Sequence, residues 1–405
     1  MTGPAEASDA PCAEVPDAHC AEVPDAPCAG VPTLRRTTVL PRTVRTPART
    51  RDASYSGLWE RRVLSTNYLK PTGRNVGGTQ HGWMTVPVSP DPALYLTRDL
   101  DAVMLASPAI RRGLRGSAIA RIRRGAYIDA SEWATLDAAG RYRALIRATA
   151  LEASDPPVLS HYSAAVFWGL PTIGSWPSDV HMLVKRASGG RSDPGVRRHA
   201  LGIADEDVTA IDGLRVTTLA RTVVDLAATA PLYSAVAAVD ASLYQARRGA
   251  PARVTRAELI AQWERMTPFR SWVRARKIID FAVMNSGSTS ESTSRASIAL
   301  LGFPTPILQK DFIVDGKQSF VDFYWEECDG IGECDGFAKY TDPIILAGRT
   351  TDQAVLEEKD RENSLRRLVA GFQRWNSSEA MRPAWLRVKL LELGLQQGSA
   401  RLRKM

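Results

Sequence analysis

Apolar and polar positions alternate in two runs near the C-terminus, and this alternation predicts a β-hairpin. The first run, SFVDFYW, carries Asp322, and the second, GECDGFAKY, carries Glu333 and Asp335 after a CDG turn. If the runs pair about Glu327–Cys328, Asp322 lies opposite Glu333. Asp335 then shares a sheet face with Glu333, because strand side chains alternate with period two. The pattern therefore predicts three carboxylates on one face, in a register that a slip of one residue would break.

Helical spacing of apolar residues recurs through the middle of the chain, between short runs that are typical of strands. Residues 130–153 predict one amphipathic helix, and residues 160–170 predict a second, which the proline that follows ends. DVHMLVKR and the stretch Ile211–Val216 predict strands. TTLARTVVDLAA then predicts a helix that Thr217 or Thr218 caps. This middle region is therefore a mixed α/β segment.

The stretch STSESTSRASIALLG predicts the helix that opens the last part of the chain. Ser290 is the expected N-cap, Glu291 lies in the first turn, and Gly302 ends the helix. Glu291 and Arg295 are four residues apart, so they form one candidate ion pair. In the alternative, Glu291 points at the carboxylates of the hairpin.

A charged helix, VLEEKDRENSLRRL, follows the hairpin, and a turn and a short strand at GFQRW come after it. Its basic residues would lie beside the acidic face, where they could hold a phosphate. They are Lys359, Arg361, Arg366 and Arg367. The alternative is an exposed helix laced with salt bridges.

The N-terminal ninety residues lack the pattern of a folded domain. Three copies of an eight-residue Pro- and Ala-rich unit span residues 9–32, and residues 33–74 hold ten Lys and Arg against two acids. The first segment cannot bury enough apolar surface to offset its chain entropy, so we expect disorder. The second could bind phosphate backbones without sequence preference. In the alternative, translation starts downstream of both.

Composition extends this picture only in part. The chain has 405 residues, of which 44% are apolar, so two or three domains with real cores are expected. The net charge of +8 favours polyanionic partners such as nucleic acid. No run is apolar enough to span a membrane, and no charged-then-apolar leader is present, so we expect a cytoplasmic protein.

The region between residues 93 and 130 combines helical spacing with a concentrated positive charge. RIRRGAYI predicts a turn into a strand, which resembles the wing of a winged helix-turn-helix. Six arginines and no acid lie between residues 111 and 124. We expect them to contact DNA. They are Arg111, Arg112, Arg115, Arg121, Arg123 and Arg124.

Three carboxylates on one sheet face repel each other unless a cation lies between them. The predicted hairpin therefore favours a Mg²⁺ or Mn²⁺ site. The histidines and cysteines carry less weight, because no CxxC or Cys/His spacing typical of a zinc site occurs. His161 and His181 have no nearby acid or cysteine cluster in the sequence, so the favoured interpretation is structural.

The order of these pieces resembles the AbiEi-like antitoxins of actinobacterial type IV toxin–antitoxin systems. The matching pieces are RIRRGAYI, SHYSAAVFWGLP, VTTLARTVVDLA, SESTSRASIALLGFPTP, VDFYW, GECDGFAKYTD, LEEKDREN and FQRW. The resemblance implies a winged helix-turn-helix and an antitoxin-like middle region. It also implies a C-terminal PD-(D/E)XK domain of the restriction-endonuclease-like fold, related to the very-short-patch repair nucleases.

The resemblance also implies roles for individual residues. Asp322 and Glu333 would be the metal carboxylates, and Glu291 would be the carboxylate that the helix contributes. In the nuclease pattern a water-activating lysine stands two residues after the second acid, but here Asp335 holds that position. Lys339 comes six residues after Glu333. The candidate catalytic set is therefore Asp322, Glu333, Asp335 and Lys339, and Arg361 would assist at the phosphate.

The expected fold class is α/β (α+β) and multidomain. We expect a disordered extension over residues 1–90, a winged helix-turn-helix over 91–135, an antitoxin-like region over 136–285 and an endonuclease-like domain over 286–405. The first functional hypothesis is a DNA-binding repressor or antitoxin with a cognate toxin, acting as a homodimer or a monomer. The alternatives are a Mg²⁺-dependent DNA endonuclease and an antitoxin that neutralises a nucleotidyltransferase toxin by contact.

Overall fold

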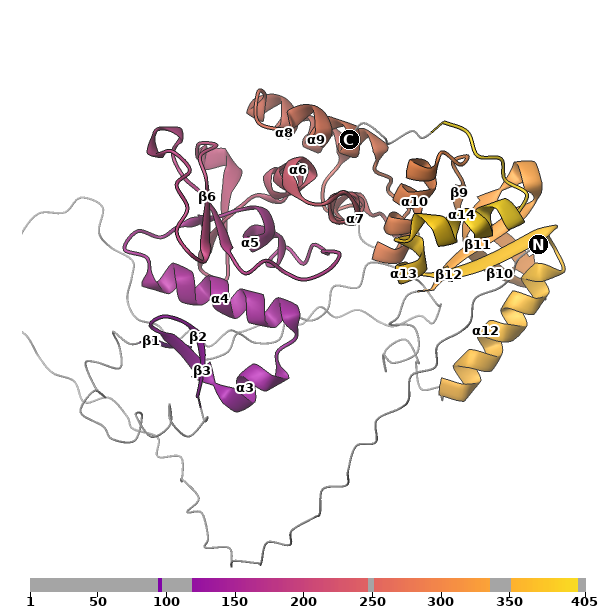
Figure 1. The fold of residues 1–405 in the computed structure, drawn as a ribbon, viewed down its shortest axis with the longest axis horizontal. Helices are drawn as coiled ribbons and strands as arrows, with labels where there is room; N and C mark the ends of the chain where they lie inside the picture. The colour runs from indigo at the N-terminus through magenta and orange to yellow at the C-terminus, as the bar shows by residue number, and fades with distance from the viewer. Residues whose placement is uncertain (1–93, 97–118, 247–250, 336–350, 400–405) are drawn as a thin grey trace, which may run out of the picture. The chain divides into compact units, whose positions relative to one another are not determined.

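A computed structural model describes residues 94–96, 119–246, 251–335 and 351–399 (Figure 1). All of them belong to one unit of the fold, residues 75–405. Several predictions lie outside the described residues: the extension over residues 1–90, the helices expected between 97 and 118, and Lys339. The same is true of Arg111, Arg112 and Arg115. No helix in the described part of the chain is both long enough and apolar enough to cross a bilayer.

A three-stranded antiparallel sheet comes first along the described chain. Its strands are β1 (Leu94–Leu96), β2 (Ile119–Arg123) and β3 (Ala126–Asp129), in the order β1-β3-β2. β2 and β3 form a hairpin whose turn holds Gly125 at a φ of +85°, a conformation that glycine adopts without strain. The turn and strand that RRGAYI predicts are therefore confirmed.

The single helix expected over residues 130–153 is wrong, because the chain forms two helices there. They are α3 (Ala130–Thr135) and α4 (Ala138–Glu152). The side chain of Asp137 accepts the backbone N–H of Gly140 at 2.6 Å, so it caps a new helix where the apolar pattern suggested continuity.

A second sheet has five strands and mixed directions. They are β4 (Val158–Leu159), β5 (Val180–Leu183), β6 (Val196–His199), β7 (Val208–Ile211) and β8 (Leu214–Thr217), in the order β6-β5-β4-β8-β7. The single strand predicted for Ile211–Val216 is wrong, since β7 and β8 form an antiparallel hairpin there. Asp212 and Gly213 both have positive φ and turn the chain inside the predicted strand.

The helix predicted over residues 160–170 is shorter than expected. α5 spans His161–Ala165, and turns follow it. The indole N–H of Trp168 donates to the carbonyl of Thr217 at 2.9 Å, and Gly169 has a φ of +63°. A contact with β8 and a left-handed residue therefore end the helix before the proline does.

Four helices pack together around the largest apolar core. They are α6 (Leu219–Thr229), α7 (Leu232–Leu243), α8 (Arg256–Met266) and α9 (Trp272–Phe281). Thr218 accepts the backbone N–H of Arg221 and caps α6, so the second of the two predicted caps is confirmed. α7 is buried from Ser234 to Leu243, which fits its Ala- and Val-rich sequence.

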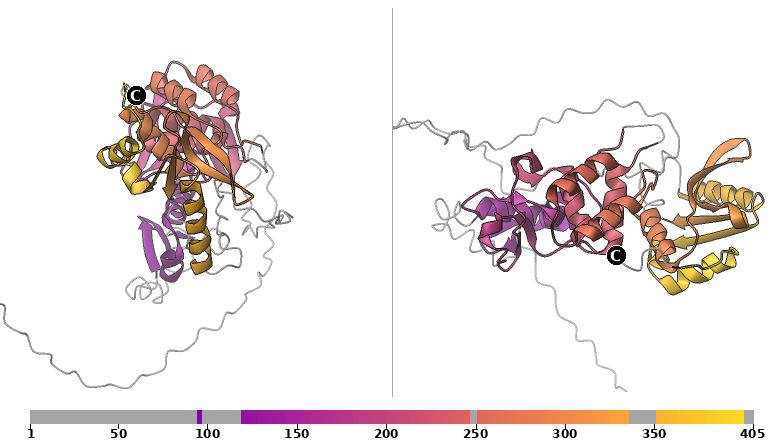
Figure 2. Two further views of the ribbon diagram at one scale, coloured as in Figure 1. Left: turned by 90° about the vertical axis from the view of Figure 1, so that its right-hand side faces the viewer. Right: turned by 90° about the horizontal axis from the view of Figure 1, so that it is seen from above.

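The C-terminal part is a four-stranded sheet with helices on both faces (Figure 2). Its elements in chain order are α10 (Thr289–Leu301), β9 (Ile307–Val314), β10 (Lys317–Trp325), β11 (Gly330–Asp335), α12 (Thr351–Arg366), β12 (Gly371–Asn376), α13 (Ser377–Ala380) and α14 (Pro383–Glu392). The sheet order is β12-β11-β10-β9, and β11 pairs with β12 in parallel. A parallel pair needs a crossover, and the segment that contains α12 provides it.

Aromatic rings fill the core between this sheet and α14. The rings of Phe323 and Trp375 stack with centroids 5.6 Å apart, and Trp325 is also buried. A Cβ atom at Gly332 would collide with the ring of Trp375, so glycine is required at this point of β11. On the opposite face, Leu365 of α12 packs against Ile331.

The start of α10 differs from the prediction by two residues. Ser288, not Ser290, is the N-cap, and its hydroxyl accepts the backbone N–H of Glu291 at 3.2 Å. Gly302 ends the helix with a φ of +79°, as predicted. Arg295 forms two hydrogen bonds with Asp240 of α7, and Glu291 turns towards β9, so the structure follows the second of the two alternatives for Glu291.

Candidate functional site

The paired strands β10 and β11 place two of the predicted acids side by side. The register runs from Phe323 opposite Gly332 to Trp325 opposite Gly330. Continued by one residue, it places Asp322 opposite Glu333, as the hairpin about Glu327–Cys328 predicts. A side-chain oxygen of Asp322 accepts the backbone N–H of Cys334 at 2.8 Å. This hydrogen bond fixes the carboxylate at the edge between the two strands.

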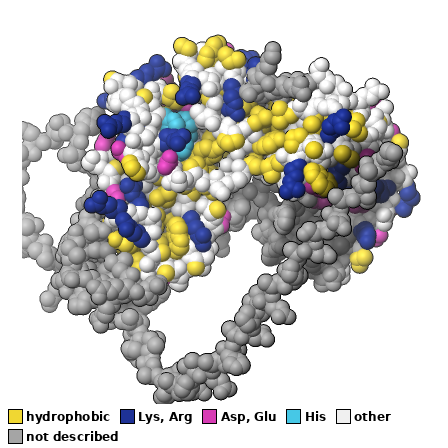
Figure 3. Space-filling model, in the orientation of Figure 1, with side chains coloured by type: hydrophobic (Ala, Val, Ile, Leu, Met, Phe, Trp, Pro, Cys, Tyr) yellow, Lys and Arg dark blue, Asp and Glu magenta, His cyan; other side chains and the backbone are white. Residues whose placement is uncertain are grey.

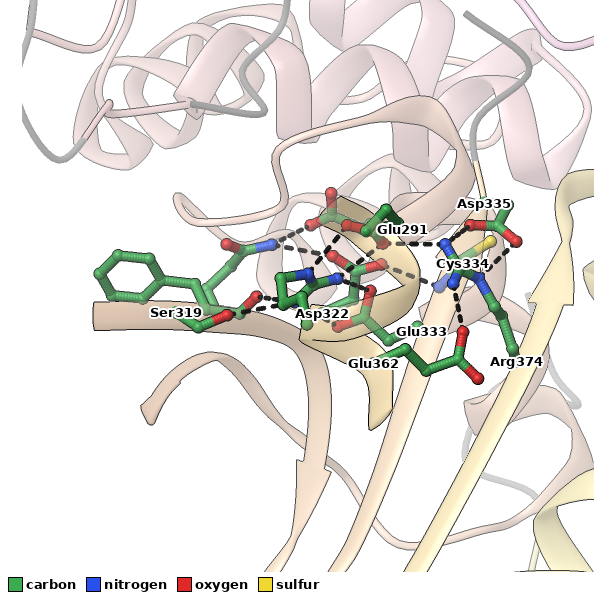
Figure 4. A network of polar contacts seen from close by, with 12 residues as sticks. Glu291, Ser319, Asp322, Glu333, Cys334, Asp335, Glu362 and Arg374 are labelled. Carbon is green, nitrogen blue, oxygen red and sulfur yellow. Dashed lines mark hydrogen bonds and ion pairs between the residues drawn. The ribbon is translucent and has the colours of Figure 1, made fainter. Parts of the chain in front are cut away.

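Gln309 of β9 connects Asp322 with Glu291. Its side-chain amide N–H group donates to Glu291 at 3.0 Å and to Asp322 at 3.3 Å (Figure 4). The backbone of Gln309 has a φ of +57°, which is uncommon for a residue with a side chain. This strained position aims the amide at the two carboxylates.

Glu333 is 2% exposed, and Arg361 of α12 neutralises it. One guanidinium nitrogen of Arg361 lies 3.0 Å from Glu333 and 2.9 Å from Glu358. Burial alone would lower the pKa of Arg361, but the carboxylates of Glu358 and Glu333 outweigh burial and raise that pKa above its ordinary value. Arg361 therefore stays charged, and it contacts acidic side chains of its own chain.

Asp335 has an arginine partner of its own. Both side-chain oxygens of Asp335 accept hydrogen bonds from Arg374 of β12 at 2.6 Å. Arg374 also contacts Glu358 at 3.0 Å and Glu362 at 2.6 Å. Glu358 thus joins the two arginines, so Glu333 and Asp335 lie on the same face, as the alternation predicts. The cations between these carboxylates are guanidinium groups.

The acidic site does not have the arrangement that a Mg²⁺ ion needs. Carboxylate oxygens are the right chemistry for Mg²⁺. In the described part of the chain, however, the carboxylates of Glu291, Asp322 and Glu333 do not all come within 4.8 Å of one another. The Gln309 amide lies between the first two acids, and Arg361 lies on the third. We therefore derive no metal-dependent step at this site.

Sequence reasoning missed three members of the site: Gln309, Glu358 and Arg374. Gln309 has no signal in the sequence, because its role depends on the pairing of β9 with β10 and on a local left-handed backbone. A signal existed for Arg374, because a strand that follows a crossover helix often lies parallel to the strand before it. That pairing sets Arg374 beside Glu333 in the register of β11 and β12.

The middle of the chain gives the comparison with known families. Residues 163–281 match the family described as AbiEi antitoxin C-terminal domain. The matched segment contains strands β5 to β8 and helices α6 to α9. It lies within the antitoxin-like region predicted over residues 136–285. A comparison of the chain with curated proteins found no match.

A buried ion cluster organises the AbiEi antitoxin domain. Arg221 of α6 contacts Asp207 at 2.7 Å and Asp225 at 3.2 Å. Gln262 of α8 also donates to Asp207, at 3.0 Å. Burial raises the pKa of Asp225 to about 6 although Arg221 counteracts the rise. The cluster ties α6 and α8 to the turn that precedes β7, so it belongs to the scaffold of this domain.

The arginines of the β2–β3 hairpin precede the AbiEi antitoxin domain. Arg121 and Arg124 are exposed. Arg123 is half-buried, and its guanidinium lies 3.4 Å from Glu152 of α4. Two of the three described arginines predicted to contact DNA thus face solvent, and the third also holds the hairpin against α4. Arg361, the fourth, lies among the acids of the C-terminal sheet.

The histidines predicted to be structural are joined by a third that the sequence did not single out. The rings of His161, His181 and His199 come together at the start of α5 and on the adjacent strands β5 and β6. The parallel pairing of β5 with β6 brings His199 to this place. No local spacing could have revealed it.

Proposed function

We propose that the chain is a DNA-binding antitoxin of a type IV toxin–antitoxin system. The observation that carries the proposal is the match of residues 163–281 to the AbiEi antitoxin C-terminal domain. The order of the sequence pieces outside this match supports the same assignment. This role places the protein in the cytoplasm, with DNA and a cognate toxin as its partners.

DNA binding rests on the β2–β3 hairpin and on charge. Arg121 and Arg124 extend from a tight hairpin into solvent, which is the arrangement of a wing along a phosphate backbone. The net charge of +8 adds long-range attraction to DNA. We infer that the hairpin contacts phosphates and that the region before it, residues 97–118, reads the bases.

We propose that the C-terminal domain is endonuclease-like but does not cut DNA. Its mixed sheet carries the acids expected of a nuclease core. Arg361 and Arg374 neutralise two of these acids, and the Gln309 amide occupies the space between the other two. Position 335 holds an aspartate where the nuclease pattern has a lysine. This domain would then hold DNA or a protein partner.

Growth rescue tests the antitoxin role. Cells that express the toxin gene of the same operon should recover growth when the full chain is coexpressed. A chain carrying Asp322→Asn and Glu333→Gln should rescue equally well, because the proposed role needs no hydrolysis. Failure of the folded full chain to rescue would remove the antitoxin proposal. Rescue by the unaltered chain alone would assign the protective effect to the acidic site.

One observation favours a second function, a Mg²⁺-dependent endonuclease. Glu291, Asp322 and Glu333 are each at most 5% exposed, and they come from α10, β10 and β11. Burial of three carboxylates is costly, and proteins accept that cost most often at functional sites. A nuclease of this kind would need the amide of Gln309 and the guanidinium of Arg361 to move away before a metal ion entered.

A further inference from the structure

Three of the five histidines in the chain meet at one place in the AbiEi antitoxin domain and its edge. His161 is the first residue of α5, His181 lies on β5, and His199 ends β6. One ligand nitrogen from each ring can be chosen so that all three lie within 4.8 Å of one another. Such convergence of side chains from three elements is unusual for histidines that only fill space.

The separation of the ring nitrogens is close to what one metal ion requires. Nδ1 of His181 and Nε2 of His199 are 3.1 Å apart. Two nitrogens bound to one tetrahedral Zn²⁺ are about 3.3 Å apart, given Zn–N bonds of about 2.0–2.1 Å. The ring of His161 stacks on His199 with a centroid distance of 3.6 Å. A modest rotation of His161 would complete a three-nitrogen set.

His161 is the histidine that a structural role explains least well. Its side chain is 1% exposed, and its Nε2 atom has no hydrogen-bond partner among the described residues. Its Nδ1 atom lies 3.0 Å from the hydroxyl of Ser160 and 3.8 Å from a carboxylate oxygen of Asp225. Metal-bound histidines typically direct their other ring nitrogen at such a group. This arrangement leaves Nε2 as the nitrogen for a metal ion.

The electrostatic setting keeps the imidazoles in the form that binds metals. Burial is the main cause that lowers the pKa of His181 to about 3 and of His199 to about 4, so both are neutral at pH 7. Two nearby cations would oppose a metal ion, but each has an acidic partner. Arg197 lies 3.6 Å from Asp179, and Arg221 contacts Asp207 and Asp225.

The cluster is accessible from outside. His199 is half-buried, and histidine side chains reach the surface among Lys and Arg side chains on the face in Figure 3. In the described part of the chain, the histidines are the three of this cluster. An ion could therefore enter without unfolding of the domain.

We propose that His161, His181 and His199 bind one divalent transition-metal ion, with Zn²⁺ as the best-suited ion. Three imidazole ligands leave a fourth position for water or for a ligand from a partner. Asp225 and Ser160 orient His161 behind the site. The proposal concerns a site apart from the acidic face of β10 and β11, and it does not depend on the antitoxin role.

The test is zinc binding by the purified full chain after removal of metals with a chelator. Isothermal titration with ZnCl₂ should give one site per chain, and Zn²⁺ should raise the melting temperature. Zinc X-ray absorption should show nitrogen ligands with the outer-shell scattering of imidazole. His199→Gln should weaken Zn²⁺ binding by at least about 100-fold, beyond the 10–100-fold that follows loss of a group behind the ligands. The circular dichroism spectrum of this variant should stay unchanged.

The matched control is His19→Gln, in the N-terminal repeat with Cys12, Cys20 and Cys28. This change should leave zinc binding as it was. Loss of binding in His19→Gln, or sulfur ligands in the absorption spectrum, would place the metal on the repeat and overturn the proposal. A folded, metal-depleted chain that takes up no Zn²⁺ would overturn it as well, even if the His199 variant fails to fold.

Discussion

Replacing Asp240 by alanine is expected to lower the free energy of unfolding by about 3–5 kcal/mol. Asp240 is fully buried in α7, and both of its carboxylate oxygens accept hydrogen bonds from Arg295 of α10, at 2.9 and 2.8 Å. It also accepts the hydroxyl of Ser292 at 2.7 Å and the backbone N–H of Val283 at 2.9 Å. Alanine would leave the buried guanidinium and two further donors without this acceptor.

The matched control for Asp240 is Asp280→Ala, which removes another aspartate from an ion pair with an arginine. Asp280 and Arg276 are 2.9 Å apart, but both side chains are more than a third exposed. An exposed pair of this kind contributes at most about 1 kcal/mol. Urea unfolding of both variants measures the difference. Equal losses would contradict the assignment of the Asp240–Arg295 pair as the buried link between α7 and α10.

Replacing Arg361 by leucine is expected to lower the free energy of unfolding by about 2–4 kcal/mol, somewhat less than for a fully buried pair because Arg361 is partly exposed. Arg361 contacts Glu333 and Glu358, and it donates to the hydroxyl of Ser319 at 3.2 Å. Its loss would remove the guanidinium that neutralises Glu333. If guanidinium groups are the cations of this site, its stability depends on Arg361.

A double variant separates charge from packing at this site. Arg361→Leu combined with Glu333→Gln should recover part of the loss, because the buried carboxylate is then neutral. Arg387→Leu, at an exposed position of α14, is the matched control and should change the free energy of unfolding by no more than about 0.5 kcal/mol. If Arg361→Leu costs no more than this control, Arg361 is not the neutralising cation.

Local patterns in the sequence predicted the elements whose determinants are close in the chain. The register of β10 and β11 follows from the turn at Glu327–Cys328, so Asp322 opposite Glu333 could be expected. Thr218 and Gly302 mark helix ends through hydrogen bonds and a backbone angle that involve only their neighbours. The cap at Ser288 was missed because four residues in this Ser- and Thr-rich stretch could all serve as caps.

The parts that could not be predicted depend on contacts between distant segments. His199 joins His161 and His181 only because β6 pairs with β5 across a long loop. The amide of Gln309 reaches two acids through a backbone angle that the sequence does not indicate. A repeating pattern likewise concealed the cap at Asp137, because the apolar spacing of α3 and α4 fits one helix. Pairing between remote strands and local strain, not propensity, decided these positions.

The most direct test of the regulator account is one gel of a plasmid that carries the chain's own promoter, incubated with the full chain in Mg²⁺ and in Mn²⁺. The account predicts retarded but intact plasmid. Arg121→Ala with Arg124→Ala should weaken retardation and lower the salt dependence by about two phosphate contacts. Arg270→Ala with Arg382→Ala, two exposed arginines elsewhere, should change neither. Metal-dependent nicking that Asp322→Asn and Glu333→Gln both abolish would contradict the account and identify a nuclease.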